Sequence, residues 1–228
     1  NEKFVWATSW GISTRLIGAV ILAHGDNKGL RLPPNIAPIQ VVIIPISRDE
    51  EQKVLVKDYI DTIVNELKDI SVRHTVDWSD ASPGYKFNDW EMKGVPIRME
   101  IGPRDVESNM VVIARRDSGE KNTIPIDNIR DKTSNLLVEI QNELFDEAKK
   151  FRDSNTHAVK TYEDFKKIIK SGGFVRCGWD GSEETESKIK DETKATIRCV
   201  PFDENPEKIR CVYSGKPARH EVIYAKSY

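Results

Sequence analysis

The stretch Ile39-Gln-Val-Val-Ile-Ile-Pro-Ile46 decides the fold of the middle of the chain. Its apolar residues follow one another with little polar alternation, which predicts a strand that is buried on both faces. Residues 50–69 come next, and in them Val56, Ile60 and Ile63 lie at helical spacing. A buried strand followed by an amphipathic helix is typical of an α/β domain.

The same alternation continues on the C-terminal side. The pattern predicts strands over residues 72–76, 95–101, 110–115 and 122–126, and a short helix over residues 87–93 that Gly94 closes. Strands that alternate with helices predict an α/β domain with a mixed or parallel sheet. Beyond it we expect a smaller α/β unit, with helices over residues 134–153, 162–170 and 185–192 and β-prone segments over 174–177, 196–202 and the tail to Tyr228.

Towards the N-terminus the pattern changes. Residues 4–11 are a β-prone aromatic run that ends in glycine, and helical spacing of apolar residues begins at Ile12. Residues 24–29 have the composition of a turn, and neither Pro33 nor Pro34 can continue a helix or lie in a central strand. A domain boundary is therefore expected at these prolines. The predicted domains are residues 1–36, 37–133 and 134–228.

Composition excludes several classes of protein. The chain has 35 Lys and Arg against 37 Asp and Glu, so it does not bind nucleic acid through bulk positive charge. This balance does not exclude a local basic patch. Its apolar stretches are far shorter than the roughly 20 residues that span a bilayer, and the N-terminal residues lack the pattern of a secretion signal. Three widely spaced cysteines suit a reducing compartment. A cytoplasmic protein without a membrane partner is expected.

Few motifs point to a metal or to a catalytic group. The sequence contains no HExxH, P-loop or GxGxxG motif, and its four histidines lack metal-ligand spacing. Cys177, Cys199 and Cys211 are too far apart for a CxxC pair and are interpreted as ordinary small apolar residues.

Two segments could contact a nucleotide or RNA. Residues 80–91 bring Tyr, Phe and Trp close together, and the basic residues that follow are Arg98, Arg104, Arg115, Arg116 and Lys121. Such a mixture can bind single-stranded RNA. On composition alone, however, a solvated strand edge beside a small aromatic core is the favoured explanation. The strand–glycine–helix junction over residues 8–15 places Arg15 at the start of a helix, where an anion binds favourably. The alternative interpretation is an ordinary turn with a surface arginine.

Several stretches, taken together and in order, resemble prolyl-tRNA synthetase of the archaeal- and eukaryotic-like type. They are Thr8–Gly18, His24–Leu30, Leu32–Val42, Trp90–Arg98, Glu100–Asp105, Gly215–Ala218 and Ala225–Tyr228. The resemblance runs from the third class II signature motif to the C-terminus. It implies the C-terminal portion of a longer enzyme, which alone is inactive. The implied fold is the end of a class II catalytic domain, an α/β anticodon-binding domain with a mixed sheet, and a small α/β C-terminal domain.

The resemblance also implies a function. Enzymes of this family are ligases of protein biosynthesis that couple L-proline to tRNA(Pro) through prolyl-adenylate, with ATP and Mg as the nucleotide substrate, and the intact enzymes are homodimers. The alternative is a non-catalytic RNA-binding protein that kept the same scaffold. Intact class II motifs one and two upstream of Asn1 would decide for the enzyme.

Site residues are implied by the same resemblance. Arg15 is the motif-three arginine that lies against ATP, with Ser13 beside it, and residues 9–11 (Ser9, Trp10 and Gly11) form one wall of the proline pocket. Glu91, Arg98 and Lys121 are the anticodon readers. Proline anticodons share two adjacent guanines, whose N–H donors suit a carboxylate and whose O6 and N7 acceptors suit Arg or Lys.

The last predicted domain departs from the family in one respect. Many relatives hold a structural zinc there with four cysteines, and the aligned positions in this chain are Asp180, Thr185, Cys211 and Ser214. Because Thr and Ser cannot replace thiolates as zinc ligands, we expect no zinc.

Overall fold

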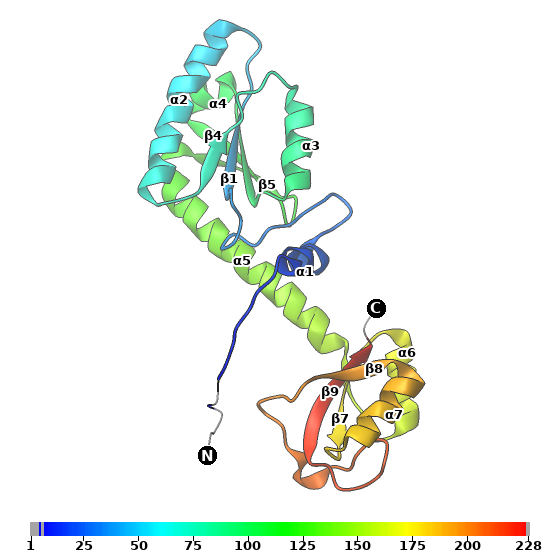
Figure 1. Ribbon diagram of the computed structural model, residues 1–228. Coiled ribbons are helices and arrows are strands. Elements are labelled where there is room, and N and C mark those ends of the chain that lie inside the picture. Colours follow the sequence, from blue (N-terminus) through cyan, green and yellow to red (C-terminus); the bar gives the residue numbers. More distant parts are fainter. Residues whose placement is uncertain (1–4, 6, 227–228) are drawn as a thin grey trace. The chain divides into compact units, whose positions relative to one another are not determined.

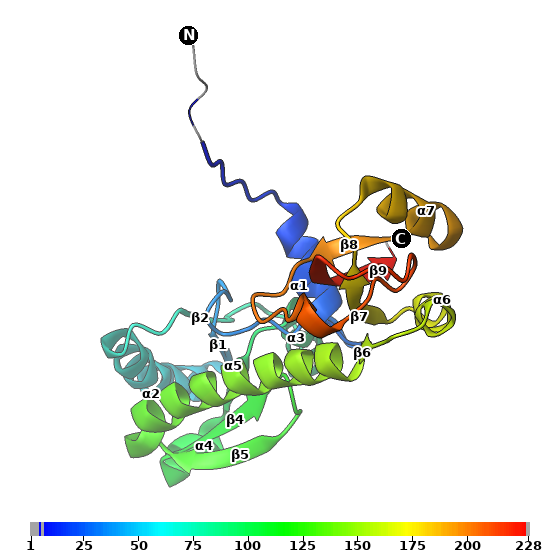
Figure 2. The same cartoon turned by 90° about the horizontal axis from the view of Figure 1, so that it is seen from below.

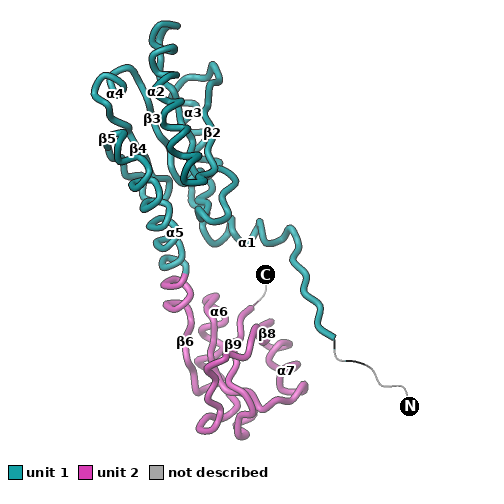
Figure 3. The backbone as a smooth tube through the Cα atoms, turned by 90° about the vertical axis from the view of Figure 1, so that its left-hand side faces the viewer, with its two compact units in different colours: residues 1–148 teal, residues 149–228 magenta. Residues whose placement is uncertain are grey.

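The computed structural model describes residue 5 and residues 7–226, which fall into two compact units, residues 1–148 and 149–228 (Figure 3). Each unit has its own mixed sheet. The predicted division into three domains stays a prediction. Within the residues that the structure describes, no helix is both long enough and apolar enough to cross a membrane.

The first unit is an α/β domain preceded by a helix. Its elements are α1 (Arg15–His24), β1 (Val41–Pro45), α2 (Glu50–Asp69), β2 (His74–Val76), α3 (Pro83–Lys93), β3 (Ile97–Ile101), α4 (Pro103–Ser108), β4 (Met110–Arg115), β5 (Lys121–Pro125) and the start of α5 (Ile129–Ser154). The sheet order is β2-β1-β3-β4-β5, in which β1 runs parallel to β2 and β3 and the other pairs are antiparallel. The predicted mixed α/β sheet is confirmed.

The core of this unit lies mainly on one face of the sheet. All five residues of β1 are buried, as the unbroken apolar run predicts. On one face, α2 and α5 pack their apolar stripes against the strands. On the opposite face α3 brings Phe87 and Trp90 against Val42, Ile44 and Val95, so that α2 and α3 flank the sheet from opposite sides (Figure 1).

The ends of α3 have local causes. Ser82 accepts a hydrogen bond from the backbone N–H of Tyr85, and Pro83 occupies the first turn, which explains why the helix begins before the predicted residue 87. At the other end Gly94 adopts a left-handed φ of 76°. A Cβ at that position would come within 2.5 Å of the Cβ of Leu30, so glycine permits the segment before β1 to lie directly against the end of α3.

The N-terminal strand is the expectation that differs most from the structure. Residues 5 and 7–13 form no strand, while Phe4 and Trp6 lie outside the described residues. An extended run makes ladder hydrogen bonds only when another strand lies beside it, so β-propensity alone does not produce a strand. The predicted helix is present as α1, which has no buried residue.

The second unit is a smaller α/β domain. Its elements are β6 (Thr156–Ala158), α6 (Tyr162–Ser171), β7 (Phe174–Trp179), α7 (Glu183–Thr193), β8 (Ala195–Cys199) and β9 (His220–Lys226), with sheet order β6-β7-β9-β8. Both helices cover one face of this sheet, where Phe165, Ile169 and Ile189 pack on Val222 and Tyr224 (Figure 2). The last two residues of the Ala225–Tyr228 stretch lie outside the described residues.

Candidate nucleic-acid interface

A cleft lies on the α3 face of the first sheet, and strand register produces it. Arg98 on β3 is paired with Ala114 on β4, and Ala114 with Lys121 on β5. Residues paired in this way point to the same face of the sheet. Because alanine contributes only a methyl group, space remains above it, and both long cationic side chains line a cleft of about 230 Å³ there.

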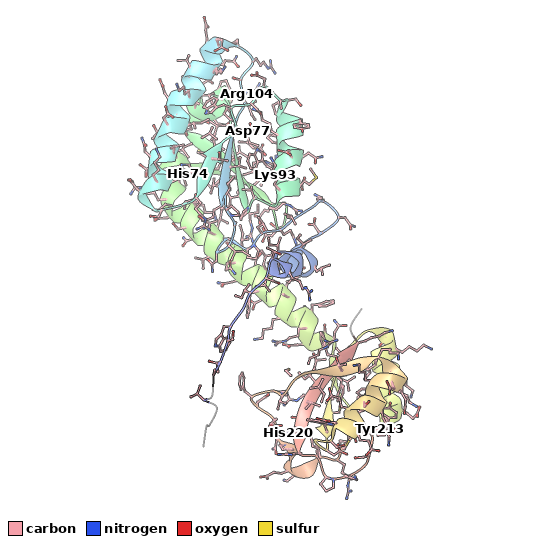
Figure 4. All side chains as sticks on the ribbon, viewed as in Figure 1. His74, Asp77, Lys93, Arg104, Tyr213 and His220 are labelled. Carbon is pink, nitrogen blue, oxygen red and sulfur yellow. The ribbon has the colours of Figure 1, made fainter. Side chains whose placement is uncertain are left out.

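The walls of the cleft come from α3 and from two turns. The residues that line it include Phe87, Trp90 and Glu91 from the helix, Lys28 from the turn before β1, and Gly119 from the β4–β5 turn. Asp77, labelled in Figure 4, follows β2. It holds the helix in place by accepting a hydrogen bond of 2.7 Å from Trp90 Nε1. The structure thus brings all three predicted anticodon readers, Glu91, Arg98 and Lys121, into one space.

Glu100 joins the two cations of the cleft. It follows Arg98 by two positions on β3 and therefore shares its face. Its Oε1 accepts from Arg98 Nε at 3.1 Å and from Arg98 Nη2 at 2.9 Å. Lys121 Nζ donates to its Oε2 at 3.1 Å and lies 2.8 Å from Oε1. The Glu100 and Arg98 side chains are 12% and 16% exposed, whereas Lys121 is 49% exposed. One carboxylate against two cations leaves this trio with a net positive charge.

Phe87 adds a flat apolar surface to the same cleft. The guanidinium carbon of Arg98 lies 4.4 Å from the centre of its ring, and Lys121 Nζ lies 5.4 Å from it. Both distances are within the range of cation–π attraction. Aromatic rings and guanidinium planes are the surfaces on which unpaired RNA bases stack.

Glu91 lies in the last turn of α3 and forms an ion pair of 3.2 Å with Lys28, whose side chain is 68% exposed. The turn that carries Lys28 is anchored by Asp26. Arg116 donates to both Asp26 carboxylate oxygens, and this hydrogen bonding holds the pKa of Asp26 well below its ordinary value. Arg116 Nε also donates to the backbone oxygen of Glu91 at 2.7 Å, so one arginine fixes both the turn and the helix end.

Two other basic residues of the sequence cluster have different surroundings. Arg115 points its guanidinium at Asp117, Glu139 and Glu143, with contacts of 2.6–3.1 Å. Its hydrogen bond with Asp117 is the main cause of the raised pKa of this guanidinium, and the side chain ties β4 to α5. Arg104 lies on α4 and is exposed.

The residues assigned to ATP and proline lie at the start of α1. Ser13 Oγ accepts from the backbone N–H of Arg15 at 3.4 Å, a local contact at the start of the helix. Residues 9–11 are an exposed irregular segment, and Trp10 is 93% exposed. Their assignment to a substrate pocket stays a prediction.

The four positions aligned with zinc ligands do meet in space. Asp180 Oδ2 accepts from Ser214 Oγ at 2.6 Å and from Thr185 Oγ1 at 3.0 Å, and the backbone N–H of Ser214 points at Cys211 Sγ. Burial opposes the charge on Asp180, but these hydrogen bonds, together with those from Ser182, lower its pKa to about 2.

This donor set does not suit zinc, because hydroxyl groups occupy two of the four positions and are instead donors to the carboxylate. Among the residues that the structure describes, no three His, Cys, Asp or Glu side chains are grouped to hold a metal. The expectation of a zinc-free protein stays a prediction.

Glu100, Phe87 and Lys28 contact the three predicted readers but were not assigned as readers, and their sequence signals differ. Glu100 could have been found from its spacing of two from Arg98 on a predicted strand. Phe87 precedes Glu91 by four positions, which places both on one side of a helix. Lys28 has no local signal, because its position depends on the contact of Asp26 with Arg116, 90 positions away.

Residues 40–136, which contain the five-stranded mixed sheet and the cleft, match the family described as "Anticodon binding domain". Residues 162–228 match the family described as "Prolyl-tRNA synthetase, C-terminal". The chain thus contains an anticodon-binding domain and a C-terminal domain of the prolyl-tRNA synthetase type, in agreement with the resemblance of its sequence.

Similar curated proteins carry the name "Proline--tRNA ligase". The protein from Bacteroides fragilis is 48% identical over 231 residues, which is 99% of this chain and 46% of that protein. The one from Christiangramia forsetii is 49% identical over 228 residues, with the same two shares, and the one from Porphyromonas gingivalis is 47% identical over 231 residues. The chain spans about half the length of the curated relatives it matches.

Proposed function

We propose that this chain is the C-terminal part of a class II proline–tRNA ligase and that its first unit reads the anticodon of tRNA(Pro). The observation that supports this most directly is the placement of Glu91, Arg98 and Lys121 around one cleft, within residues that match an anticodon-binding family. The relatives named "Proline--tRNA ligase" support the activity of the longer protein.

The chemistry of the cleft suits guanine. Arg98 and Lys121 supply donors for the O6 and N7 acceptors of the base, and the Glu91 carboxylate accepts from its N1–H and N2–H₂ groups. The Phe87 ring and the Arg98 guanidinium offer flat faces that stack on the base. Adenine carries an amino group in place of O6. That amino group is a donor and would face the donors of Arg98 and Lys121.

The longer protein would perform the chemistry in two steps. The carboxylate of proline attacks the α-phosphate of ATP, which binds with Mg, and displaces pyrophosphate to give prolyl-adenylate. The 3′-terminal ribose hydroxyl of tRNA then attacks the prolyl carbonyl carbon and displaces AMP. In this proposal Arg15 and Ser13 hold ATP, while Ser9, Trp10 and Gly11 form one wall of the proline pocket. Positioning and stabilisation of charge are the main contributions of such residues. The intact protein is proposed to be a cytoplasmic homodimer.

Binding of RNA hairpins to the 228-residue chain tests the anticodon assignment. One hairpin carries the two adjacent guanines, and in the other both are adenines. Each base contact is worth about 1–3 kcal/mol, so Arg98→Ala should remove most of the preference for guanine and Lys121→Ala a smaller part. Glu91→Gln should weaken the preference for guanine, because the new N–H₂ group can face the N–H donors of guanine. Total affinity for RNA should rise, because a negative charge near the phosphate backbone is lost.

Arg104→Ala is the matched control, since it removes a cation from the exposed surface of α4 outside the cleft. It should reduce binding of both hairpins equally and only slightly. If the three cleft variants also lower binding of both hairpins equally, these residues contact only the RNA backbone, and the proposal of anticodon reading is wrong.

A further inference from the structure

We infer that Glu100 is a positioning residue for guanine recognition: it holds Arg98 and Lys121 so that their remaining donors face the cleft. The inference rests on the proposed reading of the anticodon. It assigns Glu100 no contact with the base, because its carboxylate is already engaged with both cations at 2.8–3.1 Å.

The argument begins with the donors of Arg98. A guanidinium has five N–H groups. The Nε–H and one Nη2–H are directed at Glu100 Oε1, at 3.1 and 2.9 Å, and one Nη1–H is directed at the backbone oxygen of Phe87 at 3.5 Å. Three of the five are therefore used, which leaves one on Nη1 and one on Nη2. The free Nη2 donor lies at the tip of the side chain, on the edge away from Nε, and in the proposed arrangement it forms a fork there with the free Nη1 donor.

A fork of two parallel N–H groups is the arrangement that matches O6 and N7 of guanine. Glu100 occupies the edge of the Arg98 guanidinium that contains Nε, so the edge that stays available to a base is the one formed by Nη1 and Nη2. The plane is fixed a second time by the Phe87 ring, 4.4 Å from the guanidinium carbon. An arginine held on two sides presents one hydrogen-bonding edge instead of several.

Lys121 is constrained by the same carboxylate. An ammonium group has three N–H donors. Lys121 Nζ donates one of them to Glu100 Oε2 at 3.1 Å and lies 2.8 Å from Oε1, so the carboxylate holds one side of the ammonium group. The Lys121 side chain is 49% exposed and flexible. Without Glu100 its ammonium group would extend into water and attract the phosphates of any RNA, whatever the base sequence.

Charge gives Glu100 a second effect on selectivity. With the carboxylate present the trio has a net charge of about +1, and without it the net charge is about +2, which favours every nucleic acid through the phosphate backbone. Specificity is a difference between two affinities, so raising the affinity for wrong sequences lowers it. Glu100→Gln should therefore bind RNA in general more tightly and select guanine less well.

Modified bases separate positioning from direct reading. In 7-deazaguanine the N7 acceptor is absent, so the base reports on the Arg98 fork. Inosine lacks the 2-amino donor and reports on Glu91. We would measure binding of the 228-residue chain, with and without Glu100→Gln, to hairpins carrying two guanines, two 7-deazaguanines, two inosines or two adenines.

The wild-type chain should lose on the order of 5- to 100-fold in affinity with either modified base. The Glu100→Gln chain should keep the inosine effect, but its 7-deazaguanine effect should shrink to about twofold, and its affinity should fall more steeply with salt. Glu107→Gln, which removes one exposed carboxylate on α4, should retain both effects of the wild type.

Glu100→Asp keeps the charge but shortens the reach, so it should show a partial loss of the 7-deazaguanine effect even if the glutamine variant is poorly folded. If the wild-type chain binds the guanine and adenine hairpins equally, the proposed function is wrong. If the wild type prefers guanine and both Glu100 variants keep its 7-deazaguanine effect, the inference is overturned. Loss of the inosine effect in Glu100→Gln would also overturn it, because Glu100 would then be a direct reader.

Discussion

Asp26 and Arg116 stand 90 positions apart in the sequence and meet through two hydrogen bonds of 2.9 and 2.7 Å. The contact attaches the turn before β1 to the sheet of the same unit. It places Lys28 beside Glu91, at the rim of the cleft. A segment that the sequence assigns to the preceding domain thereby becomes part of the candidate interface.

Asp26→Asn should loosen this turn. The amide cannot balance the charge of Arg116, whose side chain is 5% exposed, so part of that arginine's pairing is lost. Because Asp26 itself is 35% exposed, we expect a loss of only about 1 kcal/mol in the free energy of unfolding. Urea denaturation would measure it. Unchanged stability would mean that the ion pair contributes little and that the hydrogen bond of Arg116 to the helix end suffices.

Arg15→Ala, made in the full-length protein, should abolish ATP–pyrophosphate exchange and leave tRNA binding nearly intact. The guanidinium is proposed to lie on ATP, where an alanine offers neither charge nor donors. Exchange assays and RNA binding, measured on the same preparation, test both halves of this expectation. Normal exchange with weakened tRNA binding would refute the assignment of Arg15.

The Asp180 cluster predicts a dependence of stability on acid. The folded pKa of Asp180 lies at about 2, below its ordinary 3.8. The stabilisation is therefore present above about pH 4 and is lost as the pH falls towards about 2, because protonation then removes the acceptor. We expect the loss to be about 1–2 kcal/mol after allowing for screening by water. Thermal unfolding across this range would measure it.

Asp180→Asn should flatten the acid dependence and lower stability at neutral pH, while Asp191→Asn on the exposed side of α7 should do neither. An acid profile that is the same with and without the Asp180 carboxylate would show that other groups cause it.

Zinc should be absent from the purified protein by elemental analysis, and a chelator should leave its melting temperature unchanged. The physical reason is that two hydroxyl groups of the Asp180 cluster donate hydrogen bonds where zinc would need thiolates. About one zinc per chain, together with destabilisation by the chelator, would contradict this expectation.

Local patterns account for the parts of the fold that could be predicted. The unbroken apolar run of β1 and the regular stripe of α2 are each contained within one segment, and α2 has the predicted bounds of residues 50 and 69. The segments that were missed are short: α4 has six residues and β6 three, too few for a period to show.

The cleft could be predicted only in part. On composition alone, Arg98 and Lys121 could be residues of a solvated strand edge. Their predicted role came from the resemblance to a family. What brings them together is strand register, through Ala114, and register depends on pairing between segments. The position of Lys28 likewise depends on a contact made across the unit, which no local window of sequence contains.

A series of hairpins with single-base changes tests the central claim most directly. The 228-residue chain would be titrated with a hairpin that carries the proline anticodon and with hairpins in which one anticodon base at a time is replaced. The account predicts that replacing either of the two adjacent guanines costs about 1–3 kcal/mol of binding free energy and that replacing the remaining anticodon base costs much less. Equal affinity for every hairpin in the series would contradict it.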